Sequence, residues 1–470
     1  MIAYNFAPEG NAGAYRPLRF VRHLPGKGWK PTILTLETDF YERYDPGLVA
    51  LIPEEVSVVR VRNPDPWQAF QAKRSQRVRE KVSAASKETT GSIQAERQSR
   101  LRRSLRTAVH SFETWFYHPD MAMTWIWPAV RTIAEVSSAA KPDIIWATAP
   151  PWSSLVVGAL SARRISVPYV LDFRDSWTLT YTNFERERPS WAKRLDRRIL
   201  GKLFQGASGV ILRSQTEAEC FCRAYHGALQ SSKIHIIPNG FEGRIEQHTI
   251  TRGEHCTVLY TGTLSDYRFD TLLRGVKELK ERHPQCAQEL RFHFIGEATE
   301  AVAQEAVALG ISEMVSTSKA TSQDVLAQLS AKAHAFLLLE RPASMRGHEL
   351  LAGAKLFGYL KSGKPIIGVL PNCEARNILQ RIGVTMIADA DSTSDIVTIL
   401  RQLVDAWRKD ALSQLAPIPA LCEAYSSERQ TAALVRVFEG LPPADSFVPG
   451  SVDVPASLRE EIGATGWQAG

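Results

Sequence analysis

The sequence predicts an α/β protein with two doubly wound domains, each built on a mainly parallel sheet with crossover helices. Short β-rich apolar runs alternate with longer helical segments along the chain, which is typical of this fold class. The chain also has 470 residues, which is more than one hydrophobic core usually organises. We expect domains at residues 1–240 and 241–440, joined near the stretch IPNGFEGRIEQ, residues 237–247.

Seven apolar runs predict the strands of the first domain. In chain order they are IAYNF (2–6), KPTILTL (30–36), VSVVRV (56–61), DIIWAT (143–148), PYVLDF (168–173), GVILR (209–213) and IHIIP (234–238). Residues 64–135 interrupt this series with a polar, basic stretch that ends in a region rich in aromatic side chains, residues 111–130. We expect this insertion to be an amphipathic excursion on the surface.

Five further runs predict the strands of the second domain, and periodic segments between them predict helices. The strands are CTVLYTG (256–262), LRFHFIG (290–296), HAFLLL (334–339), KPIIGVL (364–370) and VTMIA (384–388). The helical segments are residues 267–282, 299–309, 323–332 and 396–409. Helical segments continue to about residue 440 and would cross back to the first domain. Residues 441–470 lack a sustained apolar period, so we expect a disordered tail.

The net charge of +7 belongs to one segment of the chain. Residues 71–110 contain eleven Lys or Arg and three Glu, a net charge of +8, so the remaining residues together carry −1. General affinity for nucleic acid is therefore not indicated. Two interpretations of the segment stay open: a solvated helical insertion, or a surface for anionic lipid head groups or an anionic acceptor.

The sequence indicates a cytoplasmic protein that is soluble or peripheral to a membrane. No apolar stretch approaches the roughly 20 residues of a membrane-spanning helix, and the N-terminus, MIAYNFAPEG, lacks the regions of a signal peptide. The six cysteines form no CxxC pair, so neither a zinc site nor a disulfide framework is indicated.

Two glycine-containing turns after predicted strands are candidate phosphate sites, because helix N-termini at the carboxyl ends of parallel strands attract anions. The first turn contains Gly10 and Gly13 and lacks the GxGxxG spacing of a dinucleotide site. A plain strand-to-helix turn is the alternative there. The second turn contains Gly262, with Arg268 just before a helix. Arg268 could grip a phosphate with two hydrogen bonds, or form a surface ion pair with Asp266 or Asp270.

A third candidate site lies in HELLAGAKLFGYLKSGKPIIGV, residues 348–369. The pattern places Lys355 in the first turn of a helix that Gly363 and Pro365 terminate. The helix dipole disfavours a cation at this end, so its presence suggests an anion beside it. The alternative is a surface lysine whose stem lies along its helix.

A charged constellation follows the predicted strand PYVLDF in the first domain. Asp172, Arg174 and Asp175 lie at the carboxyl end of that strand, followed by Trp177. These charges could form only a satisfied ion pair. A carboxylate beside an arginine at the mouth of a strand could also hold and activate a sugar hydroxyl.

Six motifs together resemble the family-4-like glycosyltransferases of the GT-B fold. They are GNAGAYRPLRF, ATAPPWSS, LDFRDSW, IPNGF, YTGTL and AKLFGYLKSGKPIIG, in the expected order over residues 1–440. Within this family, the chain is most similar to bacterial enzymes that add amino or deoxy sugars during surface polysaccharide assembly. The resemblance implies two Rossmann-like domains facing a cleft, and a nucleotide sugar held chiefly by the second.

The resemblance also implies roles for individual residues. Gly10 and Gly13 would face the donor phosphates, and Arg268 and Lys355 would bind the diphosphate beside the turn of Gly262 and Thr263. Arg174 and Asp175 occupy the place where the common family pattern has a histidine that contacts the sugar, as in the polysaccharide subgroup. Asp175 would orient or activate the acceptor hydroxyl.

The implied reaction is transfer of a hexosyl or N-acetylhexosaminyl group, usually with retention, to a glycan or lipid-linked acceptor. It needs no metal and no cofactor, because basic side chains and helix ends neutralise the diphosphate. A UDP-sugar is the expected donor. The expected location is the cytoplasm, with peripheral contact at the inner membrane face.

One position departs from the family pattern. The family usually has two glutamates eight residues apart, the second of which grips the donor ribose, but Gly358 stands at the second position and Leu350 at the first. Glu349, one residue away, would be a substitute for the first acid. Two alternatives to a transferase therefore remain: a nucleotide-sugar epimerase of the same architecture, and a non-catalytic GT-B scaffold.

Overall fold

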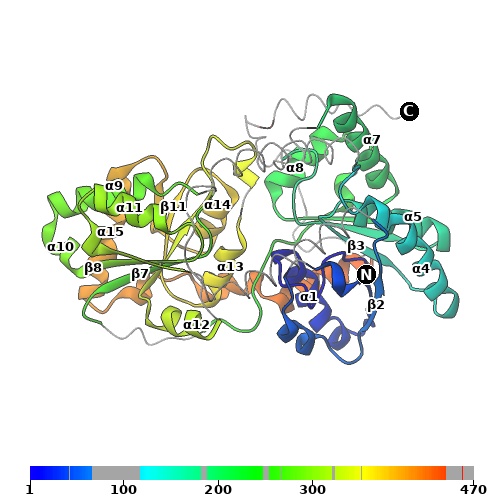
Figure 1. The fold of residues 1–470 in the computed structure, drawn as a ribbon, viewed down its shortest axis with the longest axis horizontal. Coiled ribbons are helices and arrows are strands. Elements are labelled where there is room, and N and C mark those ends of the chain that lie inside the picture. The colour runs from blue at the N-terminus through cyan, green and yellow to red at the C-terminus, as the bar shows by residue number, and fades with distance from the viewer. Residues whose placement is uncertain are drawn as a thin grey trace, which may run out of the picture. The chain divides into compact units, whose positions relative to one another are not determined.

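The structure is a computed structural model that describes residues 1–41, 43–65, 117–180, 188–246, 253–265, 267–319, 323–350, 352–440 and 458. The chain divides into two compact units (Figure 1): unit 1 contains residues 1–237 and those from Thr431 onward, and unit 2 contains Pro238–Gln430. The basic segment 71–110, most of the predicted insertion, and the predicted disordered tail apart from Leu458 lie outside the described residues.

Unit 1 is built on parallel strands. Its four-stranded sheet has the order β3 (Ile145–Ala149), β4 (Tyr169–Phe173), β5 (Gly209–Leu212) and β6 (Ile234–Ile236), and β1 (Thr32–Leu36) pairs separately with β2 (Ser57–Val61). Every residue of β3, β4 and β5 is buried, as expected for parallel strands with both faces covered.

The predicted strand at residues 2–6 is not a regular strand in the structure, although its first residues hydrogen-bond to both neighbouring strands. Ile2 forms isolated bridges with Leu34 of β1 and with Ala147 of β3, so the chain start lies between these two strands. Backbone hydrogen bonds to β1 continue as far as the Tyr4 carbonyl oxygen, which accepts the Leu36 amide across 3.3 Å, before Phe6 and Ala7 turn into an apolar cluster with residues of the following helix. The start of the chain therefore links β1 to β3 without forming a strand of its own.

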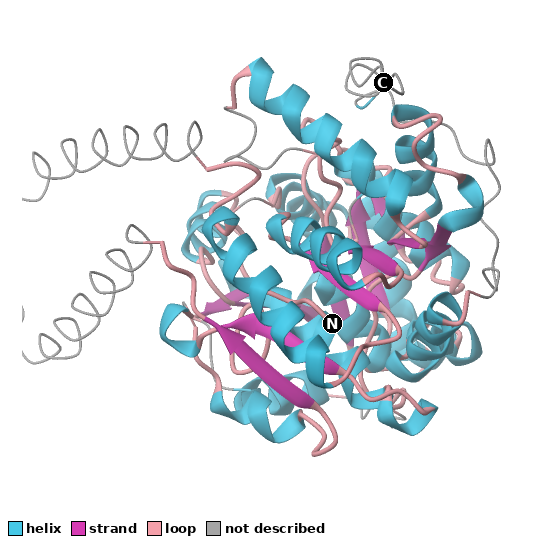
Figure 2. Cartoon of the chain, turned by 90° about the vertical axis from the view of Figure 1, so that its right-hand side faces the viewer, coloured by secondary structure: helices cyan, strands magenta, loops and turns pink. Residues whose placement is uncertain are grey.

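The helices of unit 1 surround its strands, as Figure 2 shows. They are α1 (Ala12–His23), α4 (Ile126–Ala139), α5 (Ser153–Ile165), α7 (Ser190–Gly206) and α8 (Gln215–Ala224). The last helix, α17 (Ser427–Phe438), adds its second half to this core, where Leu434 and Val437 join a buried cluster with Phe20, Trp146 and Val170.

Unit 2 contains a six-stranded parallel sheet with the order β12-β11-β10-β7-β8-β9. The strands are β7 (Cys256–Thr261), β8 (Leu290–Ile295), β9 (Val315–Ser318), β10 (Ala335–Leu339), β11 (Ile366–Leu370) and β12 (Ile387–Asp389). The chain runs outward from β7 to β9, returns to the centre at β10, and runs outward on the other side to β12. The strand order therefore reverses between β7 and β10, which is the kind of switch point where open α/β sheets bind ligands.

The helices of unit 2 confirm the periodic segments predicted from the sequence. They are α9 (Asp270–Arg282), α10 (Pro284–Glu289), α11 (Glu300–Ala308), α12 (Gln323–Lys332), α13 (Ala354–Lys361), α14 (Glu374–Arg381), α15 (Thr393–Arg408) and α16 (Pro419–Cys422). The sequence did not predict β9, which is a short, partly exposed edge strand rich in Ser and Thr. It also predicted β12 too early, because residues 384–386 precede the pairing with β11.

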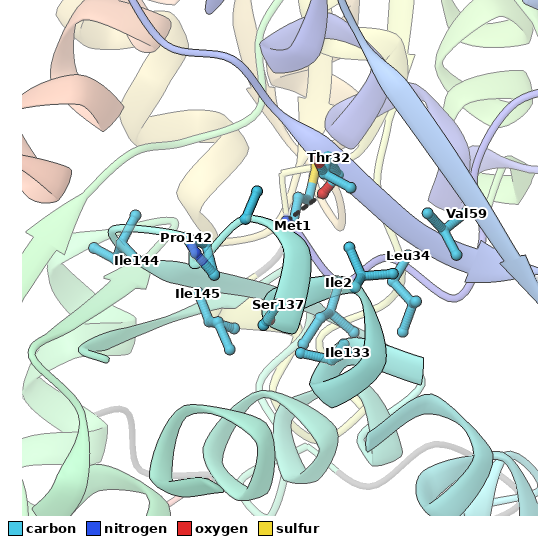
Figure 3. Close-up of a pocket in the computed structure, with 12 residues that line it drawn as sticks. Met1, Ile2, Thr32, Leu34, Val59, Ile133, Ser137, Pro142, Ile144 and Ile145 are labelled. Atoms are coloured by element: carbon cyan, nitrogen blue, oxygen red, sulfur yellow. Dashed lines mark hydrogen bonds between the residues drawn. The ribbon is translucent and has the colours of Figure 1, made fainter. Parts of the chain in front are cut away.

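A mainly apolar hollow lies in unit 1 at the amino ends of β1 and β3 (Figure 3). Ile2, Leu34 and Ile145 are among the residues that line it, and the amino group of Met1 donates a hydrogen bond to the Thr32 carbonyl oxygen across 2.7 Å. Ligands of open α/β sheets bind beyond the carboxyl ends of the strands. The site predicted from the motifs therefore lies at the opposite end of the sheet from this hollow.

Three properties of the described residues bear on function. Their six cysteines all carry free thiols. They contain no group of three His, Cys, Asp or Glu side chains arranged to hold a metal ion. No helix among them has both the length and the apolar character needed to cross a bilayer.

Candidate functional site

Three predicted residues of unit 2 meet at the switch point of its sheet. Gly262 and Thr263 directly follow β7, and Lys355 is the second residue of α13, the helix after β10. A Cβ at Gly262 would come within 2.4 Å of the Lys355 Cε, so the lysine stem lies against the bare glycine. Gly262 also has a φ of +116°, which strongly favours glycine. Conformation and space therefore both require glycine at this turn.

The ammonium of Lys355 is held by aromatic rings and oxygen dipoles. Its Nζ lies 4.4 Å from the ring centroid of Tyr260 and 4.3 Å from that of Tyr267. It donates hydrogen bonds to the Tyr260 hydroxyl and, across 3.3 Å, to the Thr263 carbonyl oxygen. Among the described residues, no carboxylate forms an ion pair with it. Ring faces attract a cation without neutralising it, so the protonated group can still attract an anion.

Burial lowers the pKa of Lys355 to about 8, and the charge of Glu340 partly opposes this shift. Glu340 directly follows β10, is 6% exposed, and accepts a hydrogen bond from the Gly353 amide across 2.9 Å. Burial raises the pKa of the Glu340 carboxyl, against the Gly353 hydrogen bond and the Lys355 charge. The helix dipole favours a negative charge beside Lys355, and the Glu340 carboxylate of the protein supplies part of it.

Arg268 has carboxylate partners on both edges of its guanidinium group. Its Nε and Nη2 donate to Asp270 across 3.2 and 3.1 Å, and its Nη1 donates to Asp391 across 3.1 Å. The side chain is 48% exposed. None of these contacts involves Lys355, although Tyr267, the residue before Arg268, places its ring against the Lys355 ammonium.

Two further positions of unit 2 bear on the predicted donor site. Glu349 lies in a short 3-10 turn, His348–Leu350, where its Oε2 is 3.3 Å from the His348 Nδ1. Gly358 lies one turn after Lys355 on α13, and a Cβ at Gly358 would meet no atom within 4 Å. The surface beside Lys355 is therefore open at the position where the family pattern has a glutamate.

In unit 1, Arg174 joins two turns at the carboxyl ends of the strands. It follows β4, and its guanidinium group donates to the carbonyl oxygens of Gly13, in the first turn of α1, and of Pro150, after β3. A Cβ at Gly13 would lie 2.7 Å from the Arg174 Nη1, so Gly13 allows this close approach. Burial lowers the pKa of Arg174 to about 10. Gly10 lies nearby in the chain and donates its amide to the Arg43 carbonyl oxygen across 2.8 Å.

Beneath Arg174, Asp172 forms a buried ion pair. Its Oδ1 and Oδ2 accept hydrogen bonds from the Arg16 Nη2 and Nε across 2.9 and 3.2 Å, and both side chains are almost fully buried. The Thr148 hydroxyl, directly opposite Asp172 on β3, donates to its Oδ2 across 2.8 Å. Asp172 is therefore a structural residue that fixes α1 against the sheet.

Asp175 is the accessible carboxylate of this constellation. Its side chain is 52% exposed, and its Oδ1 lies 3.7 Å from the Arg213 Nη1. Arg213 follows β5 and donates to the fully buried Glu217 and to the Ser176 hydroxyl, each across 3.1 Å. Glu217 also accepts the Arg213 amide across 2.8 Å. Arg213, which Glu217 holds in place, therefore faces the Asp175 carboxylate at the carboxyl end of the sheet.

The sequence analysis missed the groups that anchor both clusters. Glu217 had a usable signal, because Ser214-x-x-Glu217 after a strand is a capping-box pattern, and the Ser214 hydroxyl does accept the Glu217 amide across 3.1 Å. Glu340 also had one, since an acid directly ends a fully apolar strand. Tyr260 and Tyr267 had none, because only the fold brings their rings to Lys355.

Comparison with known proteins supports a glycosyltransferase. The family model described as Glycosyltransferase Family 4 matches residues 89–242. A search of curated proteins found no match. The resemblance predicted from the motifs is therefore confirmed by a family model that covers residues 89–242.

Solved glycosyltransferase structures share the fold of this chain. The apo form of the lipopolysaccharide outer core galactosyltransferase WaaB has a TM-score of 0.56 at 12% identity, covering 93% of this chain and 98% of WaaB. The sucrose-phosphate synthase from Thermosynechococcus elongatus has a TM-score of 0.55 at 11% identity, covering 92% and 93%. A trehalose-6-phosphate synthase has a TM-score of 0.55 at 11% identity, covering 94% and 99%. The predicted GT-B fold is confirmed.

Proposed function

We propose that this chain moves a sugar from a nucleoside diphosphate sugar to a hydroxyl group of a glycan or lipid-linked acceptor in surface polysaccharide assembly. The observation that carries this proposal is the partly desolvated ammonium of Lys355, at the N-terminus of α13 and beside the Gly262 turn. A cation and a helix N-terminus both stabilise negative charge. That charge grows on the diphosphate as its bond to the sugar breaks.

The donor is proposed to be a UDP-sugar that carries a hexosyl or N-acetylhexosaminyl group. Lys355 would bind its diphosphate, and the open turn at Gly262 and Thr263 would let the phosphate oxygens approach the backbone. Arg268 would contribute only after exchanging at least one of its two carboxylate partners for phosphate. These protein groups would neutralise the leaving group without a metal ion.

In unit 1, the proposed role of Asp175 is to accept a hydrogen bond from the acceptor hydroxyl and so orient it. The support is its exposure, together with the fixed position that Arg213 gives it. Arg174 would act indirectly, because its guanidinium group donates to the Gly13 and Pro150 carbonyl oxygens and so fixes the two turns near Asp175. We expect transfer with retention of configuration, in which the leaving phosphate helps to deprotonate the acceptor.

Thermal unfolding in the presence of UDP and a panel of nucleotide sugars tests this proposal, since a ligand that binds the folded state raises its melting temperature. We expect UDP to stabilise the wild-type chain and to lose most of this effect with Lys355→Met. Release of UDP from the best-binding sugar, with product analysis, then tests transfer. An epimerised donor formed without acceptor would instead indicate the epimerase.

Gly358 favours a second candidate, a GT-B scaffold without catalysis, because it leaves open the position that holds a glutamate in the family pattern. The Gly358→Glu variant separates the two. Its side chain has room, so the variant should fold normally and bind UDP more tightly than the wild type. If neither protein binds UDP, the scaffold is the better interpretation.

A further inference from the structure

The exposed face of α7 carries cationic and large apolar side chains. Among its exposed positions, Trp191, Arg194, Leu195, Arg198 and Lys202 recur at helical spacing and so form one stripe. We call these five residues the α7 stripe. Trp191 is 49% exposed and Leu195 is 38% exposed, although both are large apolar side chains. Figure 1 shows α7 at the periphery of unit 1.

The opposite face of α7 fixes which way the stripe points. Leu200, Leu203 and Phe204 are buried on that face, and the Phe204 ring lies 5.7 Å from that of Phe173 in the core of unit 1. Rotating the helix to hide Trp191 would expose these core residues. The exposure of the α7 stripe is therefore imposed by the packing of the helix.

The cations of the α7 stripe have no acidic partners among the described residues. The one acid of the helix, Asp196, is buried and pairs with Arg188 across 2.9 Å. No described carboxylate forms an ion pair with Arg194, Arg198 or Lys202. Within the part of the chain that the structure describes, the positive charge of the stripe is therefore uncompensated.

Helix α9 in unit 2 shows the ordinary arrangement for a surface helix. Its exposed cations are paired with acids one turn away: Arg274 with Asp270, Lys277 with Glu281, and Arg282 with Glu278. The two helices belong to the same chain, so the contrast does not reflect overall composition. Arg194, Arg198 and Lys202 of the α7 stripe, which no described carboxylate pairs, are interleaved with exposed apolar side chains and indicate a surface that meets a partner.

We propose that the α7 stripe docks unit 1 on an anionic lipid bilayer. Lipid phosphates would compensate Arg194, Arg198 and Lys202, and Trp191 and Leu195 would enter the boundary between head groups and acyl chains. A nucleic acid would match the charges, but it offers no apolar layer for Leu195. The surface is distinct from the basic segment 71–110 and does not depend on the proposed transferase activity.

Co-sedimentation of the full chain with vesicles tests this docking surface. Vesicles of equal parts phosphatidylcholine and phosphatidylglycerol should bind the wild type, and vesicles of phosphatidylcholine alone should bind it far less. The triple variant Arg194→Glu, Arg198→Glu, Lys202→Glu should lower partitioning into the anionic vesicles by about a hundredfold. Trp191→Ser should weaken binding without any change in charge. The shift in tryptophan fluorescence that vesicles cause in the wild type should be absent in this variant.

Matched variants separate the α7 stripe from general charge. Lys332→Glu, Arg401→Glu and Lys409→Glu make the same change in net charge at exposed positions of unit 2, and this triple variant should retain vesicle binding. Trp127→Ser removes a 70% exposed tryptophan outside the stripe and should also retain it. Equal loss with either control would overturn the assignment to α7.

The remaining outcomes are distinguishable. Melting temperatures of all variants, with and without UDP, show whether each one is folded and whether the donor site is intact. Failure of UDP to bind the wild type would count against the proposed transferase while leaving the vesicle result valid. Folded α7 variants that bind vesicles as well as the wild type, or that lose only binding to a labelled DNA oligonucleotide, would refute the membrane surface.

Discussion

Unit 1 and unit 2 both place cations at the carboxyl ends of their strands, but they surround them differently. Arg16 and Arg213 in unit 1 pair with the buried carboxylates of Asp172 and Glu217. Lys355 in unit 2 contacts two aromatic rings, a hydroxyl group and a carbonyl oxygen. A buried cation that pairs with a carboxylate of its own protein stabilises the fold. A cation that contacts only dipoles and aromatic ring faces can still bind an anion.

Removing a neutralised partner in unit 1 should produce the largest effect, and it should appear in stability. Asp172→Asn leaves the Arg16 charge buried without its carboxylate, so the free energy of unfolding should fall by about 3–5 kcal/mol. Urea unfolding of the variant and the wild type measures this change. Glu135→Gln, which removes an exposed pair with Arg131, is the control and should leave the melting temperature nearly unchanged. Equal stability of Asp172→Asn and the wild type would contradict the structural role of the Arg16–Asp172 pair.

Removing the cation of unit 2 should affect turnover instead of folding. Lys355→Met keeps most of the apolar stem against Gly262 but loses the charge, so transition-state stabilisation should fall by about 2–4 kcal/mol. The measurement is kcat/KM with the donor identified by thermal screening. Lys361→Met changes an exposed lysine on the same helix, paired with Glu246 across 3.6 Å, and should keep wild-type turnover. Unchanged turnover of Lys355→Met would remove this residue from the mechanism.

The sequence predicted the strands and helices of unit 2 better than the partners of its charged residues. Apolar runs such as KPIIGVL predict a buried strand from local composition, and the glycine at position 262 is explained by its own φ. The ring contacts of Lys355 are different, since nothing in the runs around Tyr260 and Tyr267 indicates that their rings meet the ammonium. Likewise, the pattern LDFRDSW did not show that Asp172 is buried and Asp175 exposed.

The pH dependence sharpens the contrast between the two kinds of cation. The pKa of Lys355 lies at about 8, below the 10.5 of an ordinary lysine, whereas burial raises the pKa of Tyr260, so that phenol stays neutral. As the pH rises through 8, the anion-binding form is lost, and UDP affinity should fall by up to about tenfold per pH unit. Calorimetric titrations with UDP on either side of pH 8 measure this fall.

The same shift has the opposite sign for the stability of the free protein. Above pH 8 the unfolded chain still binds the Lys355 proton that the folded chain has released, so this residue's contribution to the free energy of unfolding rises with pH up to about 10.5. Lys355→Met should abolish both trends. A variant that retains the fall in UDP affinity would assign the titration to another group.

Arg268 provides the smallest and most discriminating test, because its environment resembles unit 1 while the motifs assign it to the donor. Two carboxylates already neutralise it at a half-exposed position. As a surface ion pair, Arg268→Gln should change unfolding by at most about 1 kcal/mol and leave the KM for the donor almost unchanged. A role on the diphosphate would instead raise that KM or lower kcat by the amount expected for Lys355. The single variant Asp391→Asn decides between them. For a structural pair it should leave the KM for the donor unchanged, whereas for a phosphate ligand it should lower that KM, and adding Arg268→Gln should abolish the gain.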